Sequence, residues 1–191
     1  MYILGVDEAG RGPLAGPLVV GLLRAPEDFD LRAAFPGLND SKKLTEQRRE
    51  ELFALLEARC DLAYAVEWVP AADIDAYGLT KSIHDAVARG VSRLMKPGDG
   101  TVYLDGSLKA PDLYAQKTVI GGDAQIPAIM LASVVAKVLR DRMMVELGSQ
   151  YPAYGFATHK GYGTKAHYEA LRVHGPSPEH RQLFLRKFLG K

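Results

Sequence analysis

Short runs of consecutive apolar residues alternate along this chain with longer stretches in which apolar positions recur every three or four residues. Runs of the first kind are typical of buried β-strands, and the second spacing is typical of helices that bury one face. The run at 17–23 is apolar throughout, so we expect a central strand there, paired with the strand at 2–6. The pattern predicts strands at 2–6, 17–23, 62–69, 101–106 and 117–120, and helices at 45–59, 71–77, 80–95, 126–147, 164–172 and after 181. Strands interleaved with helices place the chain in the α/β class.

No internal repeat, low-complexity tract or long linker interrupts this pattern, so we expect one domain over residues 1–191. A chain of this length with 47% hydrophobic residues can bury a substantial core. No apolar run approaches the roughly 20 residues that span a bilayer, and no basic region precedes the first strand, which together predict a cytoplasmic protein without a membrane contact. A lone cysteine, Cys60, can form neither an internal disulfide nor a cysteine metal site, and we expect it in the core.

The formal net charge of +1 conceals an uneven distribution along the chain. Residues 137–191 carry ten Lys or Arg against four Asp or Glu, whereas the preceding residues carry fourteen against nineteen. Four of the five histidines also lie in this basic part. An acidic first part and a basic last part favour a carboxylate metal site beside a surface that contacts phosphates. A scattered, solvated surface is the alternative interpretation.

The first strand leads directly into two adjacent carboxylates, Asp7 and Glu8, followed by the glycine-rich segment 10–12. Neighbouring side chains on a regular strand point to opposite faces, so these two acids can share one site only where the strand ends. Gly10, Arg11 and Gly12 let the backbone approach a ligand closely and add one fixed positive charge. The combination predicts a divalent metal beside a phosphate. The alternative is a solvated strand end followed by a plain turn.

Two later strands also end at an acid next to glycine. Asp105 ends the strand at 101–106, and Asp123 follows the short strand at 117–120 and two glycines. Functional side chains gather beyond strand ends in open α/β sheets, so these acids can converge on Asp7 and Glu8. Asp141 is the rival for the fourth carboxylate, but its neighbours Arg140 and Arg142 suggest a structural ion pair. A site that offers only oxygen ligands favours Mg²⁺ or Mn²⁺ over zinc.

Three further segments offer contacts to nucleic acid. Ser41, Lys42 and Lys43 stand just before a predicted helix, where hydroxyls and lysines can meet a phosphate. Ser133, Lys137 and Arg140 fall on one face of the helix at 126–147. The segment 151–164, which contains Tyr162, interleaves aromatic rings with glycine and basic residues, a composition that suits sugar, base and phosphate contacts.

Several of these segments resemble type 2 ribonuclease H, the bacterial ribonuclease HII group. Residues 7–17 read Asp-Glu-Ala-Gly-Arg-Gly-Pro-Leu-Ala-Gly-Pro, which is similar to the opening motif of that family. The other similar segments are Asp-Ser-Lys-Lys-Leu-Thr at 40–45, Asp-Gly at 105–106, the Ala-Ser…Arg-Asp run at 132–141, Tyr-Gly-Phe at 154–156, His-Lys-Gly-Tyr-Gly-Thr at 159–164 and Ser-Pro-Glu-His-Arg at 177–181. Gly78 departs from the family, in which an asparagine is common at that place.

The resemblance implies a ribonuclease H-like mixed β-sheet flanked by helices, with a C-terminal helical extension. Residues from about 145 to 191 would form helices and a substrate-binding loop on a single catalytic domain. Cleavage would fall on the RNA strand of RNA–DNA hybrids, or 5′ to a ribonucleotide embedded in duplex DNA, leaving 3′-hydroxyl and 5′-phosphate ends. The resemblance assigns two Mg²⁺ or Mn²⁺ ions to Asp7, Glu8, Asp105 and Asp123. It assigns recognition of the 2′-hydroxyl to Gly10, Arg11, Gly12 and Tyr162, and phosphate contacts to Ser41, Lys42, Lys43, Ser133 and Lys137.

Two other functions remain open at this point. A metal-dependent DNA endonuclease or resolvase of the same general fold would use a similar acid cluster without a ribonucleotide reader. A non-catalytic nucleic-acid-binding module would need only the basic last part. The segment 182–189 also resembles the short peptides that dock on replication sliding clamps, although its apolar residues can instead pack on the sheet. We expect a monomer.

Overall fold

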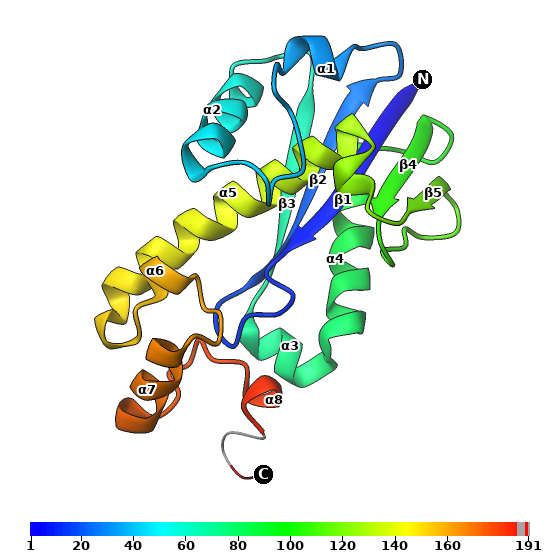
Figure 1. Cartoon of the computed structure of the whole chain (residues 1–191). Helices are drawn as coiled ribbons and strands as arrows, with labels where there is room; N and C mark the ends of the chain where they lie inside the picture. Colours follow the sequence, from blue (N-terminus) through cyan, green and yellow to red (C-terminus); the bar gives the residue numbers. More distant parts are fainter. Residues whose placement is uncertain (187–189, 191) are drawn as a thin grey trace.

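The computed structural model describes residues 1–186 and 190 and contains a mixed sheet of five strands in the order β3-β2-β1-β4-β5 (Figure 1). Antiparallel pairing joins β1 to β2 and β2 to β3, whereas β1 and β4, and β4 and β5, run parallel. The strands are β1 (Tyr2–Ala9), β2 (Leu18–Pro26), β3 (Ala63–Val69), β4 (Gly100–Asp105) and β5 (Ala115–Val119). The predicted ribonuclease H-like mixed sheet is confirmed, with β1 and β2 inside it.

Helices cover both faces of this sheet (Figure 1). On one face, α4 (Leu79–Leu94), which follows α3 (Ala71–Tyr77), packs through Ile83, Val87 and Val91 against apolar residues of the strands. On the other face lies α5 (Pro127–Gln150), together with α1 (Leu31–Ala34) and α2 (Glu46–Glu57). Two apolar clusters, one on each face, therefore form the core.

Glycines in the two inner strands allow α5 to lie unusually close to the sheet. A Cβ at Gly5 would stand 2.2 Å from the carbonyl carbon and oxygen of Ala128, and one at Gly21 would stand 2.2 Å from the Ala132 oxygen. Real Cβ atoms do not approach other atoms so closely, so any side chain at these positions would push the helix away. These two glycines thus fix the distance between α5 and the strand that carries Asp7.

The C-terminal part of the chain packs around the C-terminal end of α5 (Figure 1). It contains the short helices η2 (Pro152–Tyr154), α6 (Phe156–His159), α7 (Lys165–His174) and α8 (Gln182–Leu185). Their apolar side chains meet Leu14 and Ala15 in a third cluster. Because this cluster includes residues just after β1, the C-terminal part is tied to the segment that follows Asp7 and Glu8. The expected helical extension is confirmed.

Most element boundaries fall within a few residues of those predicted, and the departures have local causes. α1 lies inside the stretch 26–36, which lacks a helical pattern, and it forms where Asp30 accepts hydrogen bonds from the backbone N–H groups of Arg32 and Ala33. Cys60 is exposed, so its expected core position was wrong: α2 ends at Glu57, and Cys60 lies in the bend beyond it. Within the described residues, no helix has the length and apolar composition needed to cross a bilayer.

Candidate active site

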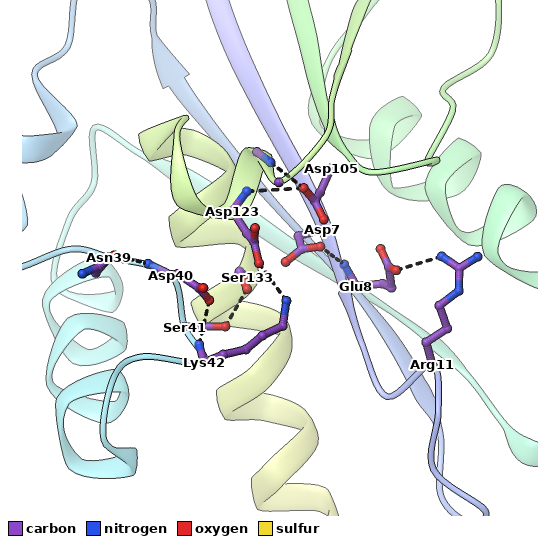
Figure 2. A network of polar contacts seen from close by, with 12 residues as sticks. Asp7, Glu8, Arg11, Asn39, Asp40, Ser41, Lys42, Asp105, Asp123 and Ser133 are labelled. Atoms are coloured by element: carbon purple, nitrogen blue, oxygen red, sulfur yellow. Dashed lines mark hydrogen bonds and ion pairs between the residues drawn. The ribbon is translucent and has the colours of Figure 1, made fainter.

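Three carboxylates from separate elements meet at one end of the parallel strands (Figure 2). Val6 of β1 pairs with Leu104 of β4, so Asp7 and Asp105 follow side by side. Asp123 belongs to η1 (Gly122–Ala124), which is joined to β4 because Asp105 Oδ1 accepts the backbone N–H of Gly122 at 2.7 Å. One oxygen from each of the three carboxylates lies within 4.8 Å of the others. This carboxylate cluster can hold a divalent ion with oxygen ligands alone.

Glu8 lies beside the carboxylate cluster rather than in it. β1 continues to Ala9, with Asp7 opposite Gly21 and Glu8 opposite Val20, so the strand has not ended where the two acids stand. Glu8 Oε1 instead accepts a hydrogen bond from Arg11 Nη1 at 3.1 Å (Figure 2). Among the described residues, Glu8 Oε2 is buried without a hydrogen-bond partner. A buried carboxylate oxygen without a donor is costly, so this oxygen is suited to bind a cation.

The site strongly disfavours negative charge in the absence of a cation. Burial, followed by the charges of Glu8 and Asp105, raises the pKa of Asp7 from 3.8 to about 8, although a hydrogen bond from Ser133 opposes the rise. Burial is also the main cause of a raised pKa at Glu8, which hydrogen bonding from Arg11 opposes. A bound divalent cation would reverse this balance by favouring the ionised carboxylates.

Cationic and hydroxyl side chains surround the carboxylate cluster. Lys42 Nζ lies 2.8 Å from Asp123 Oδ2, a contact that raises the pKa of Lys42 (Figure 2). The hydroxyls of Ser41 and Ser133 lie 2.7 Å apart and are buried, so Ser41 braces the segment before α2 against α5. Lys137 is partly exposed. In this structure the Lys42 ammonium therefore neutralises part of the charge of the carboxylate cluster.

Asp141 is confirmed as an ion-pair residue, but not with the expected partners. Lys137 Nζ lies 2.7 Å from its Oδ1, as the i, i+4 spacing on α5 allows, and Arg49 Nη2 of α2 lies 3.7 Å from its Oδ2. Arg142 pairs with Glu50 instead, and Arg140 points to backbone carbonyls. Adjacent residues on a helix project in different directions, so neither flanking arginine reaches Asp141.

A cavity of about 280 Å³ opens over this site. Tyr162 stands at its rim with 48% of its surface exposed, and Lys43 is exposed outside it. The lining residues are Asp7, Glu8, Ala9, Gly10, Arg11, Gly12, Ser41, Lys42, Asp105, Ser133, Lys137, Arg140 and Tyr162. The fold thus gathers candidate residues from five separate segments around one opening, whereas Asp123 and Lys43 are not among the lining residues.

The sequence of the chain matches a known family. The family description of ribonuclease HII matches residues 4–189. The chain belongs to the ribonuclease HII family. It is 47% identical over 182 residues to a ribonuclease HII of Geobacillus kaustophilus (strain HTA426), a match that covers 95% of this chain and 67% of that protein.

Solved structures of the family share the fold. The crystal structure of the ribonuclease H2 from Pyrococcus horikoshii OT3 matches with a TM-score of 0.79 and 30% identity, covering 98% of this chain and 96% of that one. A structure of the PCNA:RNase HII complex from Archaeoglobus fulgidus matches with a TM-score of 0.78 and 25% identity, covering 95% and 94%. The chain is accordingly a hydrolytic nuclease, a ribonuclease H endonuclease that acts on RNA–DNA hybrids.

Some residues that shape this ribonuclease HII site had no role in the sequence interpretation. Arg181, His180 and His167 are buried behind the glycine segment and Tyr162. Two of them belong to the Ser-Pro-Glu-His-Arg segment, but nothing in that segment indicates which loops it would contact. Only the folded chain places 177–181 next to residues 10–16.

The raised pKa of Asp7 predicts that the metal-free protein loses stability as the pH rises. Folded Asp7 keeps its proton up to about pH 8, whereas in the unfolded chain it releases the proton near 3.8. Between these values the folded state binds more protons, so the free energy of unfolding falls with rising pH. Urea unfolding in chelator at pH 5, 6.5 and 8 measures this fall. The Asp7→Asn variant should show a smaller fall, and parallel profiles for the two proteins would contradict the assignment.

Proposed function

We propose that this chain, as a single catalytic unit and a monomer, cleaves the RNA strand of hybrids and also cuts 5′ to a ribonucleotide embedded in duplex DNA. The products would carry 3′-hydroxyl and 5′-phosphate ends. The observation that carries the proposal is the shared cavity, in which Asp7 and Asp105 of the carboxylate cluster stand beside the glycine segment 10–12 and Tyr162. The candidate cleavage site and the residues proposed to recognise the ribonucleotide thus face the same cavity.

Two Mg²⁺ or Mn²⁺ ions would be held by Asp7, Glu8, Asp105 and Asp123. The fit is supported by the three clustered oxygens and by the buried, unpartnered Glu8 Oε2. When bound, such ions lower the pKa of the attacking water and stabilise the charge on the leaving oxygen. The acids themselves would fix the ions relative to the scissile phosphate, because each acid is anchored on β1, β4 or η1.

Recognition of the ribonucleotide would fall to Gly10, Arg11, Gly12 and Tyr162. No atom lies within 4 Å of the place where a Cβ would stand on Gly12, and Arg11 is exposed beside Glu8, so a sugar can approach the backbone closely. Tyr162 offers a half-exposed ring for packing against that sugar. The 2′-hydroxyl is the group that distinguishes RNA from DNA, and backbone amides are suitable partners for it.

Phosphate contacts would come from Ser41, Lys42, Lys43, Ser133 and Lys137. Of these, Lys42 is the test case because its ammonium lies within the cavity and 2.8 Å from Asp123. We expect Lys42→Ala to weaken substrate binding and to reduce the slope of log affinity against log salt concentration by about 1. Fluorescence titration at several salt concentrations, with Ca²⁺ in place of Mg²⁺, measures both. Lys96→Ala, at an exposed lysine beyond α4, serves as the control, and equal slopes in the two variants would contradict the contact.

The decisive experiment uses a DNA duplex containing one ribonucleotide. With Mg²⁺ or Mn²⁺ we expect a single cut on its 5′ side, and with chelator no cut. Mapping of the product ends tests the 3′-hydroxyl and 5′-phosphate. Equal cleavage of an all-DNA duplex would instead favour a DNA endonuclease or resolvase, and metal-independent binding without cleavage would favour a binding module.

Contact with a sliding clamp is a further proposal, supported by the archaeal PCNA:RNase HII complex among the structural neighbours. The candidate segment is 182–189. Within it Leu185 is buried and Phe184 packs against the core, whereas residues 187–189 lie outside the described residues. Pull-down with a sliding clamp, comparing the full chain with one that ends at residue 186, tests the contact. Unchanged binding by the shortened chain would dispose of it.

A further inference from the structure

Three segments that are distant in the sequence meet directly behind the cavity. The backbone N–H of Leu14 donates to the Gly161 carbonyl at 2.9 Å, and the N–H of Arg181 donates to the Leu14 carbonyl at 2.8 Å. The N–H of Gly16 donates to the Glu179 carbonyl at 2.9 Å. The loop after β1, the loop that carries Tyr162 and the segment 177–181 are therefore joined backbone to backbone. His180 and Arg181 stand where all three meet.

Arg181 fixes the loop after β1 from inside. Its side chain is fully buried, and its guanidinium donates to the carbonyls of Gly10 at 2.7 Å, Arg11 at 3.1 Å and Gly16 at 2.9 and 3.1 Å. Among the described residues no carboxylate forms an ion pair with it, and burial lowers its pKa to about 9. Burying the Arg181 guanidinium costs free energy, which its hydrogen bonds to these carbonyls offset. The guanidinium and the loop after β1 therefore hold each other in place.

His180 fixes the second loop through His167. His180 Nδ1 accepts the backbone N–H of Ser177 at 2.9 Å, so the neutral ring carries its proton on Nε2. That Nε2–H points at His167 Nε2, 3.0 Å away, which leaves the His167 proton on Nδ1, where it donates to the Tyr162 carbonyl at 2.9 Å. Burial lowers the pKa of both histidines, that of His180 to about 4, which keeps the rings neutral. The donor and the acceptor are thus assigned in each hydrogen bond from Ser177 through His180 and His167 to Tyr162.

We propose that His180 and Arg181 are positioning residues that set the relative placement of the two ribonucleotide-reading elements, the backbone of residues 10–12 and the ring of Tyr162. Neither side chain touches the substrate. Both loops contain several glycines, so beyond the packing of Leu14 and Ala15 in the third apolar cluster and the hydrogen bonds from Arg140, their geometry depends on these donors. The proposal rests on the proposed function, since it concerns how the same reader is held.

The test compares Arg181→Met and His180→Leu with Arg32→Met, a change at an exposed arginine of α1. Each replacement has a similar size but lacks the donors. On a duplex with one ribonucleotide we expect kcat to fall about tenfold or more, while KM stays within about twofold because the phosphate contacts are intact. His180→Gln can keep a donor at the position of Nε2 and should retain more of the activity than His180→Leu. If Arg181→Met fails to fold, Arg181→Lys replaces it.

Hydrogen exchange separates a positioning role from a general loss of structure. We expect faster exchange in peptides covering 9–16 and 159–164 of the variants, with unchanged exchange in α5 and the central strands. Wild-type kinetics in Arg181→Met and His180→Leu, or faster exchange throughout the sheet, would overturn the inference. If wild-type protein fails to cut the duplex, the proposed function fails, and the exchange of the two loops still decides whether these residues hold them.

Discussion

Replacing Asp7 by asparagine should lower turnover on an RNA–DNA hybrid by at least about 10³-fold, because the central ligand of the carboxylate cluster is lost. Asp7 precedes Glu8 in the chain and lies beside Asp105, and burial together with the charges of these two acids raises its pKa to about 8. Asparagine has nearly the same shape as the protonated carboxyl, so the metal-free fold should persist. Single-turnover kinetics with Mg²⁺ measure the loss.

Metal binding can be measured for the same variant without a substrate. Adding Mn²⁺ should raise the midpoint of thermal unfolding of the wild-type protein, and the rise should be much smaller for Asp7→Asn. Asp61→Asn is the matched control, because Asp61 is exposed and pairs with Arg59 beyond the end of α2. Full activity of Asp7→Asn, or an equal response to Mn²⁺ in both aspartate variants, would refute the assignment of the carboxylate cluster.

Gly5→Ala should be the most damaging addition of a methyl group between the sheet and α5. Its Cβ would stand 2.2 Å from the backbone of Ala128, and backbone cannot turn away as a side chain can. We expect a loss of about 3 kcal/mol in the free energy of unfolding, the upper end for overpacking. The displaced α5 carries Ser133 and Lys137, so the activity of the folded fraction should fall on the order of 10²-fold. Urea unfolding and hybrid cleavage test the two effects.

Gly78→Ala provides the comparison for this change. Gly78 has a φ of +81° and a ψ of +154°, a backbone region that is essentially restricted to glycine, and nothing lies within 4 Å of an added Cβ. Alanine there meets only this backbone cost, on the order of 1–3 kcal/mol. The activity of the folded fraction should stay near that of the wild-type protein. An equal loss of activity in the two variants would show that displacement of α5 is not the cause, and the close packing of Gly5 would then have no special role in the site.

The apolar pattern along the chain was sufficient to predict most of the strands and helices, whereas the mixed sheet flanked by helices followed from the family resemblance. The continuous run at 17–23 correctly indicated an inner strand, and the helical spacing at 126–147 correctly indicated the long α5. Both predictions succeed because a strand that is buried on both faces is apolar throughout, whereas a helix repeats its buried apolar residues every three or four positions. Residue 60 shows the limit, since a helix end shifted by two residues moved it from the expected core to the surface.

The amino-acid sequence by itself determined the family, the strand-end acids and the segments that line the cavity. Tertiary structure decided which of those acids actually meet: parallel pairing of β1 with β4 brings Asp105 to Asp7, whereas the continuation of β1 turns Glu8 towards Arg11. It also decided that Asp141 pairs with Lys137 and Arg49, and that Arg181 supports residues 10–16. The physical reason is range, because periodicity and motifs report contacts within a few residues. The contacts of Asp105 with Asp7, of Arg49 with Asp141 and of Arg181 with Gly10 join segments about ninety or more residues apart, and the direction of Glu8 depends on strand register.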